Sequence, residues 1–163
     1  MTRRFFELHR ADNEFAPMVS AILIPQSYLS LEYVLQRNAI LTEMTYPVSA
    51  VTLKQTRLFE NEIGTFTFRN IKADLYSGFT ISEHLGIPFA RATVAKALFD
   101  FLYLRPLKGY ENLASYDLVA DLRLNLEDFL KSDQEEFATF VETSKSRKMN
   151  WILNNLRRSV WQH

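Results

Sequence analysis

The sequence predicts one α+β domain, in which helices pack a small and mostly antiparallel sheet at about residues 48–70 and the C-terminal half is helical. The first observation is length, since 163 residues fit one ordinary domain, 1–163, and leave little room for a second. The second is composition, because 47% hydrophobic residues with only 4 Gly and 5 Pro are typical of a chain that buries a large core. The third is a change in hydrophobic period, from two residues in the middle of the chain to the helical period beyond residue 92.

The N-terminal part opens with a poorly defined lead segment, 1–23. Its apolar run from Met18 to Ile24, closed by Pro25, fits either a helix or a strand, because short apolar runs suit both. Farther on, the pattern predicts a helix over 28–39 with Ser27 as its N-cap. The apolar face of that helix would consist of Tyr28, Leu31, Val34, Leu35 and Ala39.

The middle of the chain carries three predicted strands. Residues 48–52 are rich in β-branched side chains, 56–60 form a second candidate, and 65–70 begin with a strict apolar and polar alternation. Turn residues up to Gly64 separate the last two strands, which predicts a hairpin. The alternating Phe66 and Phe68 favour core positions, and a stacking platform for single-stranded nucleic acid is the alternative.

The rest of the chain predicts helices. After a loop that contains Gly78, Gly86 and Pro88, the clearest amphipathic helix spans 92–104, with Thr93 as its cap and Pro106 as its stop. Further helices are predicted over 115–123, over 126–131 with Asn125 as cap, from Asp133 with Glu136 in a capping box, and from about Ser146. The last of these places on one face Met149, Ile152, Leu153, Leu156 and Val160.

Charge and cysteine content exclude several classes of protein. The 19 Lys and Arg residues balance 19 Asp and Glu residues, so no net field attracts nucleic acid or an acidic membrane. The absence of cysteine excludes disulfides, thiolate nucleophiles and Cys-ligated metals. The most apolar stretch, 97–104, contains Asp100 and is far shorter than the about 20 residues that span a bilayer. We therefore expect a cytoplasmic protein that does not contact membranes.

No sequence pattern for catalysis stands out. The three histidines, at 9, 84 and 163, lack the spacing of a metal site, and the glycine-rich phosphate loops and the serine elbow of hydrolases are missing. No lysine has an acidic residue two positions before it, and Asn70 before Lys72 is the nearest approach to the acid-x-Lys pattern of nucleases. We expect a protein that is not an enzyme, with no catalytic residues, no metal and no cofactor.

Charge is unevenly distributed near the C-terminus. Acidic residues dominate 127–142, whereas 145–158 holds five cations and no acid: Lys145, Arg147, Lys148, Arg157 and Arg158. This pattern fits an acidic helix beside a basic one that meets nucleic acid or an acidic partner. The simpler interpretation, which the pattern favours, is two solvated helix faces that compensate each other.

Three stretches together resemble the C-terminal domain of the AbiE-type abortive-infection antitoxins, a family of predicted transcriptional regulators of viral defence. The first stretch is IPQSYLSLE at 24–32, similar to the family's P-x-S-Y-[IL]-S-L-E. The second, VTLKQTRLF at 51–59 followed by IGTFTFRNI at 63–71, is similar to V-T-x-K-x-T-R-x-F and G-x-F-x-[YF]-x-x-I. The third, ATVAKALFDFLY at 92–103, resembles A-T-P-E-K-A-L-L-D-x-L-Y. The motif positions carried over are Thr52, Thr56, Gly64, Lys96 and Asp100.

The resemblance implies a regulator that counteracts a nucleotidyltransferase-like toxin, with that toxin or its nucleic-acid target as the partner. Val94 and Ala95 replace the family's Pro-Glu, and 1–23 is too short for the family's amino-terminal winged helix. We therefore expect either a stand-alone antitoxin-like domain or a chain whose DNA-reading module is separate or lost. The partner-binding or nucleic-acid-binding surface we expect combines Lys54, Arg57 and Arg69 near the hairpin with Lys145, Arg147, Lys148, Arg157 and Arg158. Cross-strand pairing of Arg57 and Arg69 with Glu60 or Glu62 is an equally good interpretation. The alternative functions are a nucleic-acid-binding or degenerate nuclease-related domain, and a structural interaction module.

Overall fold

The structure is a computed structural model that describes residues 3–9, 11–43, 47–107 and 116–161. Its centre is a six-stranded mixed sheet with the strand order β3-β4-β2-β1-β6-β5. The strands are β1 (Ser27–Leu29), β2 (Val48–Thr52), β3 (Arg57–Asn61), β4 (Gly64–Asn70), β5 (Phe79–His84) and β6 (Ile87–Ala92). The pairs β1/β2, β3/β4 and β5/β6 are antiparallel, whereas β2/β4 and β1/β6 are parallel. The α+β class and the predominance of antiparallel pairing are confirmed, although the sheet is larger than residues 48–70.

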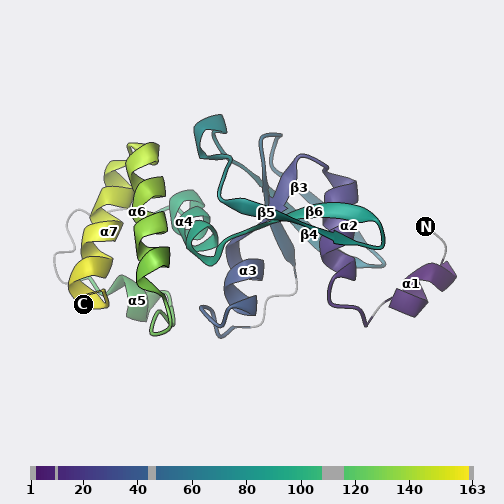
Figure 1. The fold of residues 1–163 in the computed structure, drawn as a ribbon, viewed down its shortest axis with the longest axis horizontal. Helices are drawn as coiled ribbons and strands as arrows, with labels where there is room; N and C mark the ends of the chain where they lie inside the picture. The colour runs from purple at the N-terminus through teal and green to yellow at the C-terminus, as the bar shows by residue number, and fades with distance from the viewer. Residues whose placement is uncertain (1–2, 10, 44–46, 108–115, 162–163) are drawn as a thin grey trace.

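Helices cover the sheet and form the C-terminal half (Figure 1). They are α1 (Arg3–His9), α2 (Phe15–Leu23), α3 (Leu31–Arg37), α4 (Val94–Leu104), α5 (Leu118–Asp121), α6 (Lys131–Ser144) and α7 (Arg147–Ser159), with a 3-10 turn η1 (Ala73–Leu75). The ribbon places α6 and α7 beyond α4 at one end of the molecule and α1 at the other (Figure 1). The helical C-terminal half is therefore confirmed.

The two faces of the sheet carry different helices. Tyr28 of β1 donates a hydrogen bond to Asp100 of α4, and the next residue, Leu29, points to the opposite face because strand side chains alternate. Leu29 is in register with Arg91 of β6, which forms an ion pair with Glu14 at the start of α2. Helix α2 and helix α4 consequently pack on opposite faces, and β1 is buried between them.

Residues Ser27–Leu29 of the first motif stretch form a strand, so the predicted helix over 28–39 is wrong at its start. Ser27 to Leu29 pair with both β2 and β6, and helix α3 begins only at Leu31, with Ser30 rather than Ser27 at its N-cap. Tertiary pairing on both sides of β1 overrides the helical periodicity of its apolar residues.

The predicted loop after residue 72 contains a hairpin instead. Strands β5 and β6 are joined by Leu85 and Gly86, at φ 50° and 75°. Two consecutive positive φ angles are those of a type I′ turn, whose twist matches that of the strands. Pro88 lies in β6 just after this turn, in register with Glu83 of β5.

Three C-terminal helix boundaries also differ from the prediction. Residues 126–130 form no helix and include only a turn at 127–128, and the Asn125 amide donates to Ile40 O at 2.8 Å instead of starting a helix. Helix α6 starts at Lys131, ahead of Asp133, whose carboxylate accepts from the Leu130 amide at 3.2 Å. Helix α5 is limited to Leu118–Asp121 and capped by Asp117, while residue 115, where a helix was expected to begin, lies outside the described residues.

The predicted core is confirmed where its periodicity was clear. Thr93 caps α4 by accepting from the Lys96 amide at 3.1 Å, and Ser146 caps α7 by accepting from the Met149 amide at 3.3 Å. Phe66 and Phe68 are fully buried, which makes them core residues and rules out the stacking platform. An aromatic series joins α4 to the C-terminal helices through Phe99, Phe137 and Trp161.

Candidate functional site

A buried ion pair lies at the centre of the third motif stretch. Lys96 and Asp100 are one turn apart on α4, and Lys96 Nζ lies 2.8 Å from Asp100 Oδ1. Both side chains have no solvent exposure. Helical spacing of four residues places them on one face, and that face points to the sheet.

The first motif stretch supplies hydroxyl groups to the same carboxylate. Tyr28 Oη and Ser30 Oγ donate to Asp100 Oδ2 at 2.9 and 2.8 Å. Lys96 Nζ also donates to Leu75 O at 2.7 Å, and the ammonium lies 4.9 Å from the ring centroids of Phe99 and Phe140. The network therefore connects β1, the start of α3, η1 and α6 to α4.

Burial shifts the titration of these groups. Loss of hydration raises the pKa of the Asp100 carboxyl and lowers the pKa of the Lys96 ammonium, because burial disfavours each charged form. Attraction between the two groups opposes both shifts. Burial also raises the pKa of the Tyr28 phenol, and the neighbouring Asp100 adds to this shift.

The second motif stretch orders the turn between β2 and β3. Thr52 Oγ1 donates to Gln26 O at 2.7 Å, which ties β2 to the entry of β1. Thr56 Oγ1 accepts from the Asn70 amide, and the Asn70 side chain donates to Leu53 O and Lys54 O. Gly64 occupies the hairpin turn, where Asn61 Oδ1 accepts its amide hydrogen bond. The hydrogen bonds of these motif residues therefore order the backbone of the turns.

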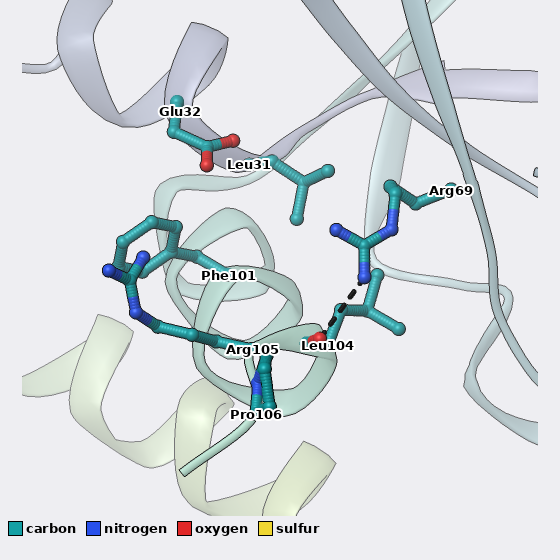
Figure 2. Close-up of a pocket in the computed structure, with 7 residues that line it drawn as sticks. All are labelled: Leu31, Glu32, Arg69, Phe101, Leu104, Arg105 and Pro106. Atoms are coloured by element: carbon teal, nitrogen blue, oxygen red, sulfur yellow. Dashed lines mark hydrogen bonds between the residues drawn. The ribbon is translucent and has the colours of Figure 1, made fainter. Parts of the chain in front are cut away.

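A charged groove lies where α3 begins and α4 ends (Figure 2). It has a volume of about 350 Å³ and is lined by Leu31, Glu32, Arg69, Phe101, Leu104, Arg105 and Pro106. A second hollow of about 290 Å³ shares three of these residues and extends the groove along the sheet to Pro47, Ser49 and Thr67. Figure 2 shows the Arg69 guanidinium reaching in from β4, with Arg105 across the groove against Phe101.

The C-terminal end of α4 brings together two of the predicted basic residues. Arg69 Nη2 donates to Leu104 O at 3.1 Å, as the dashed line in Figure 2 marks. Lys148 of α7 donates to Tyr103 O at 2.6 Å and to Arg105 O at 2.8 Å. Cations at this end of a helix satisfy its last carbonyl groups and interact favourably with the helix dipole. Partial burial lowers the pKa of Lys148.

The other predicted basic residues do not join this cluster. Lys54 and Arg57 are exposed at the turn into β3 and on β3 itself. Lys145, Arg147, Arg157 and Arg158 are exposed on or beside α7, at the far end of the molecule from β3 (Figure 1). The eight basic residues thus form separate groups, linked only by the end of α4.

Several residues of the groove and the network were missed from the sequence. Glu32, the last residue of the first motif stretch, and Arg105, which follows α4 directly before Pro106, border the groove. Tyr28 and Ser30 bind Asp100, although the sequence had placed Tyr28 on an apolar helix face. Their positions in the motif were the available signal, since a polar serine within an apolar stretch needs a buried partner.

The described residues show neither a metal site nor a helix that could span a membrane. Among the described residues, no group of three or more His, Asp or Glu side chains is arranged to hold a metal ion. In the same part of the chain, no helix combines the length and apolar character needed to cross a bilayer. Neither protein-family models, nor curated proteins, nor solved structures gave a match to this chain.

Proposed function

We propose that this chain is a cytoplasmic, antitoxin-like regulator of a phage-defence system, which counteracts a nucleotidyltransferase-like toxin without catalysing a reaction itself. One observation carries the proposal. The residues that resemble the AbiE-type family come from three separate stretches, and the first and third meet at Asp100 through Tyr28, Ser30 and Lys96.

The second stretch belongs to the same unit. Val51 is in register with Tyr28 across β1 and β2, and Thr52 is in register with Ser27. Chance similarities in separate stretches would have no reason to converge in space, whereas the conserved core of a family domain would. The convergence supports the family resemblance, and the resemblance supplies the function.

Growth rescue tests this proposal. The test requires a nucleotidyltransferase-like gene adjacent to the gene of this protein. Where there is one, it is expressed in a bacterial host with and without this protein, and growth is followed. We expect wild-type protein to restore growth when the toxin is active and to leave growth unchanged when the toxin carries an inactivating substitution. Continued growth arrest, with the protein present in soluble form, would contradict the proposal and favour a nucleic-acid-binding domain or a structural module.

A further inference from the structure

Three charged side chains surround the groove of Figure 2 without neutralising one another. Glu32, Arg69 and Arg105 come from α3, β4 and the end of α4. Within the described part of the chain, ion pairs within 4.0 Å involve other residues and none of these three. Charged groups of both signs around one hollow are suited to a ligand that carries an anion and hydrogen-bond donors.

The two arginines retain the capacity to bind an anion. Arg69 uses one N–H group on Leu104 O, and a guanidinium offers five donors in a planar fork. The Arg105 guanidinium lies 5.2 Å from the centroid of the Phe101 ring, which orients its plane. Each guanidinium group can bind the oxygens of a phosphate in bidentate geometry from its own side of the groove.

The rest of the groove is suited to a base and a sugar. Phe101 itself is buried, but the face of the Arg105 guanidinium that points away from this ring is a surface on which a nucleobase can stack. The Glu32 carboxylate accepts hydrogen bonds from N–H groups of a base or from a ribose hydroxyl. The apolar side chains of Leu31, Leu104 and Pro106 complete the wall, and the neighbouring hollow at Thr67 lengthens the space.

The negative charge of Glu32 also selects against a continuous phosphate backbone. A duplex or a long strand would place several phosphates near this carboxylate, and like charges repel. A single nucleotide unit places its phosphate at the arginines and its neutral base or sugar at Glu32. From these features we infer that the groove binds one nucleoside phosphate, either free or as the phosphorylated end of an RNA strand. The inference stands on the groove alone and does not depend on the antitoxin proposal.

Calorimetric titration of the full chain tests the inference. The probes are the four ribonucleoside monophosphates, inorganic phosphate, and a short RNA with or without a 5′ phosphate. We expect at least one monophosphate, or the phosphorylated RNA, to bind more tightly than inorganic phosphate. Tight binding of the phosphorylated RNA and not of monophosphates identifies the strand end as the source, whereas the reverse identifies the free nucleotide.

Single substitutions distinguish nucleotide binding in the groove from binding at other basic surfaces. Arg105→Met removes a guanidinium whose described contact is the Phe101 ring, and should weaken nucleotide binding by about tenfold or more, as expected for one charge-assisted group. Glu32→Gln should weaken nucleotide binding while leaving inorganic phosphate unaffected or better bound. Arg4→Met is the matched control, because this exposed arginine on α1 does not line the groove and lies outside the expected binding surface.

Thermal melts confirm that each variant is folded. Binding of no probe at millimolar concentration would overturn the inference. So would equal affinity for nucleotides and inorganic phosphate, or equal loss of binding in Arg105→Met and Arg4→Met.

Discussion

The Lys96 and Asp100 side chains hold α4 to three other parts of the chain. Moving two charges out of water costs free energy, and their attraction offsets that cost only when the remaining polar atoms are satisfied. Here Asp100 accepts from Tyr28 and Ser30, and Lys96 donates to Leu75 O. The Lys96 ammonium is the partner of the other carboxylate oxygen, Asp100 Oδ1, so each member of the pair depends on the other.

Removing one member of the pair should lower the free energy of unfolding strongly, and the effects of removing both should be less than additive. Lys96→Met leaves the buried carboxylate without its cation, so we expect a loss of about 3–5 kcal/mol in the free energy of unfolding. The double variant Lys96→Met with Asp100→Leu should lose less than the sum of the two single variants, since no charge remains stranded. Urea unfolding of the three variants measures this coupling. A Lys96→Met variant that loses under about 1 kcal/mol would contradict the structural role assigned to the pair.

At the scale of elements, Gly78 lets β5 approach α4 and α6 closely. Its φ is 77°, and its carbonyl accepts from the Thr93 amide at 2.9 Å, just before α4 starts. A Cβ atom at this position would lie 2.4 Å from Phe140 Cζ and 3.0 Å from Lys96 Cγ. The glycine is therefore required by both backbone conformation and packing.

Gly86 provides a matched control for this position. Its φ is 75°, nearly that of Gly78, but a Cβ atom there would meet nothing within 4 Å. Gly86→Ala should therefore cost only the left-handed strain, about 1–2 kcal/mol, and Gly78→Ala should cost roughly 1–3 kcal/mol more because of the clash. Chemical unfolding of both variants gives the difference. Equal losses would show that Phe140 and Lys96 yield without cost and that the approach is not tight.

The elements that could be predicted are those whose own residues carry a clear hydrophobic period and a capping residue. Helix α7 buries one periodic face, whereas α4 is buried on all sides from Ala95 to Leu102. Both helices begin at a capping hydroxyl and carry apolar residues at helical spacing, so the sequence identified them. Strand β1 has only three residues and is buried on both sides, so it carries no alternation. Strand β5 is largely exposed, which hides it from any pattern based on burial. The groove needs side chains from α3, β4 and α4 at once, and no local pattern specifies their meeting.

At the scale of the whole molecule, apolar packing attaches the C-terminal helices to the rest of the domain, and most of their cations are exposed outside this packing. Met149, Ile152 and Leu156 of α7 are fully buried. Lys148 is the exception among the basic residues, because its ammonium satisfies carbonyl groups at the end of α4. A substitution at Lys148 therefore tests stability, whereas substitutions at the exposed cations test binding.

The four exposed residues Lys145, Arg147, Arg157 and Arg158 should be replaced together by Gln. Exposed charges contribute only about 0–1 kcal/mol per pair, so the melt of the quadruple variant should stay close to that of wild type. The single variant Lys148→Met should lower the melting temperature more, because the carbonyl groups of Tyr103 and Arg105 lose their donor.

If this basic face meets the toxin or its nucleic-acid target, the quadruple variant should fail to restore growth in the rescue assay. Any nucleic-acid binding should show a flatter dependence of affinity on salt, because each phosphate contact contributes to that slope. Full rescue by a quadruple variant with a wild-type melt would remove these four residues from the binding surface. The hairpin side would then be the remaining predicted surface. There, Arg69 lines the groove, Lys54 lies in the turn before β3, and Arg57 lies on β3.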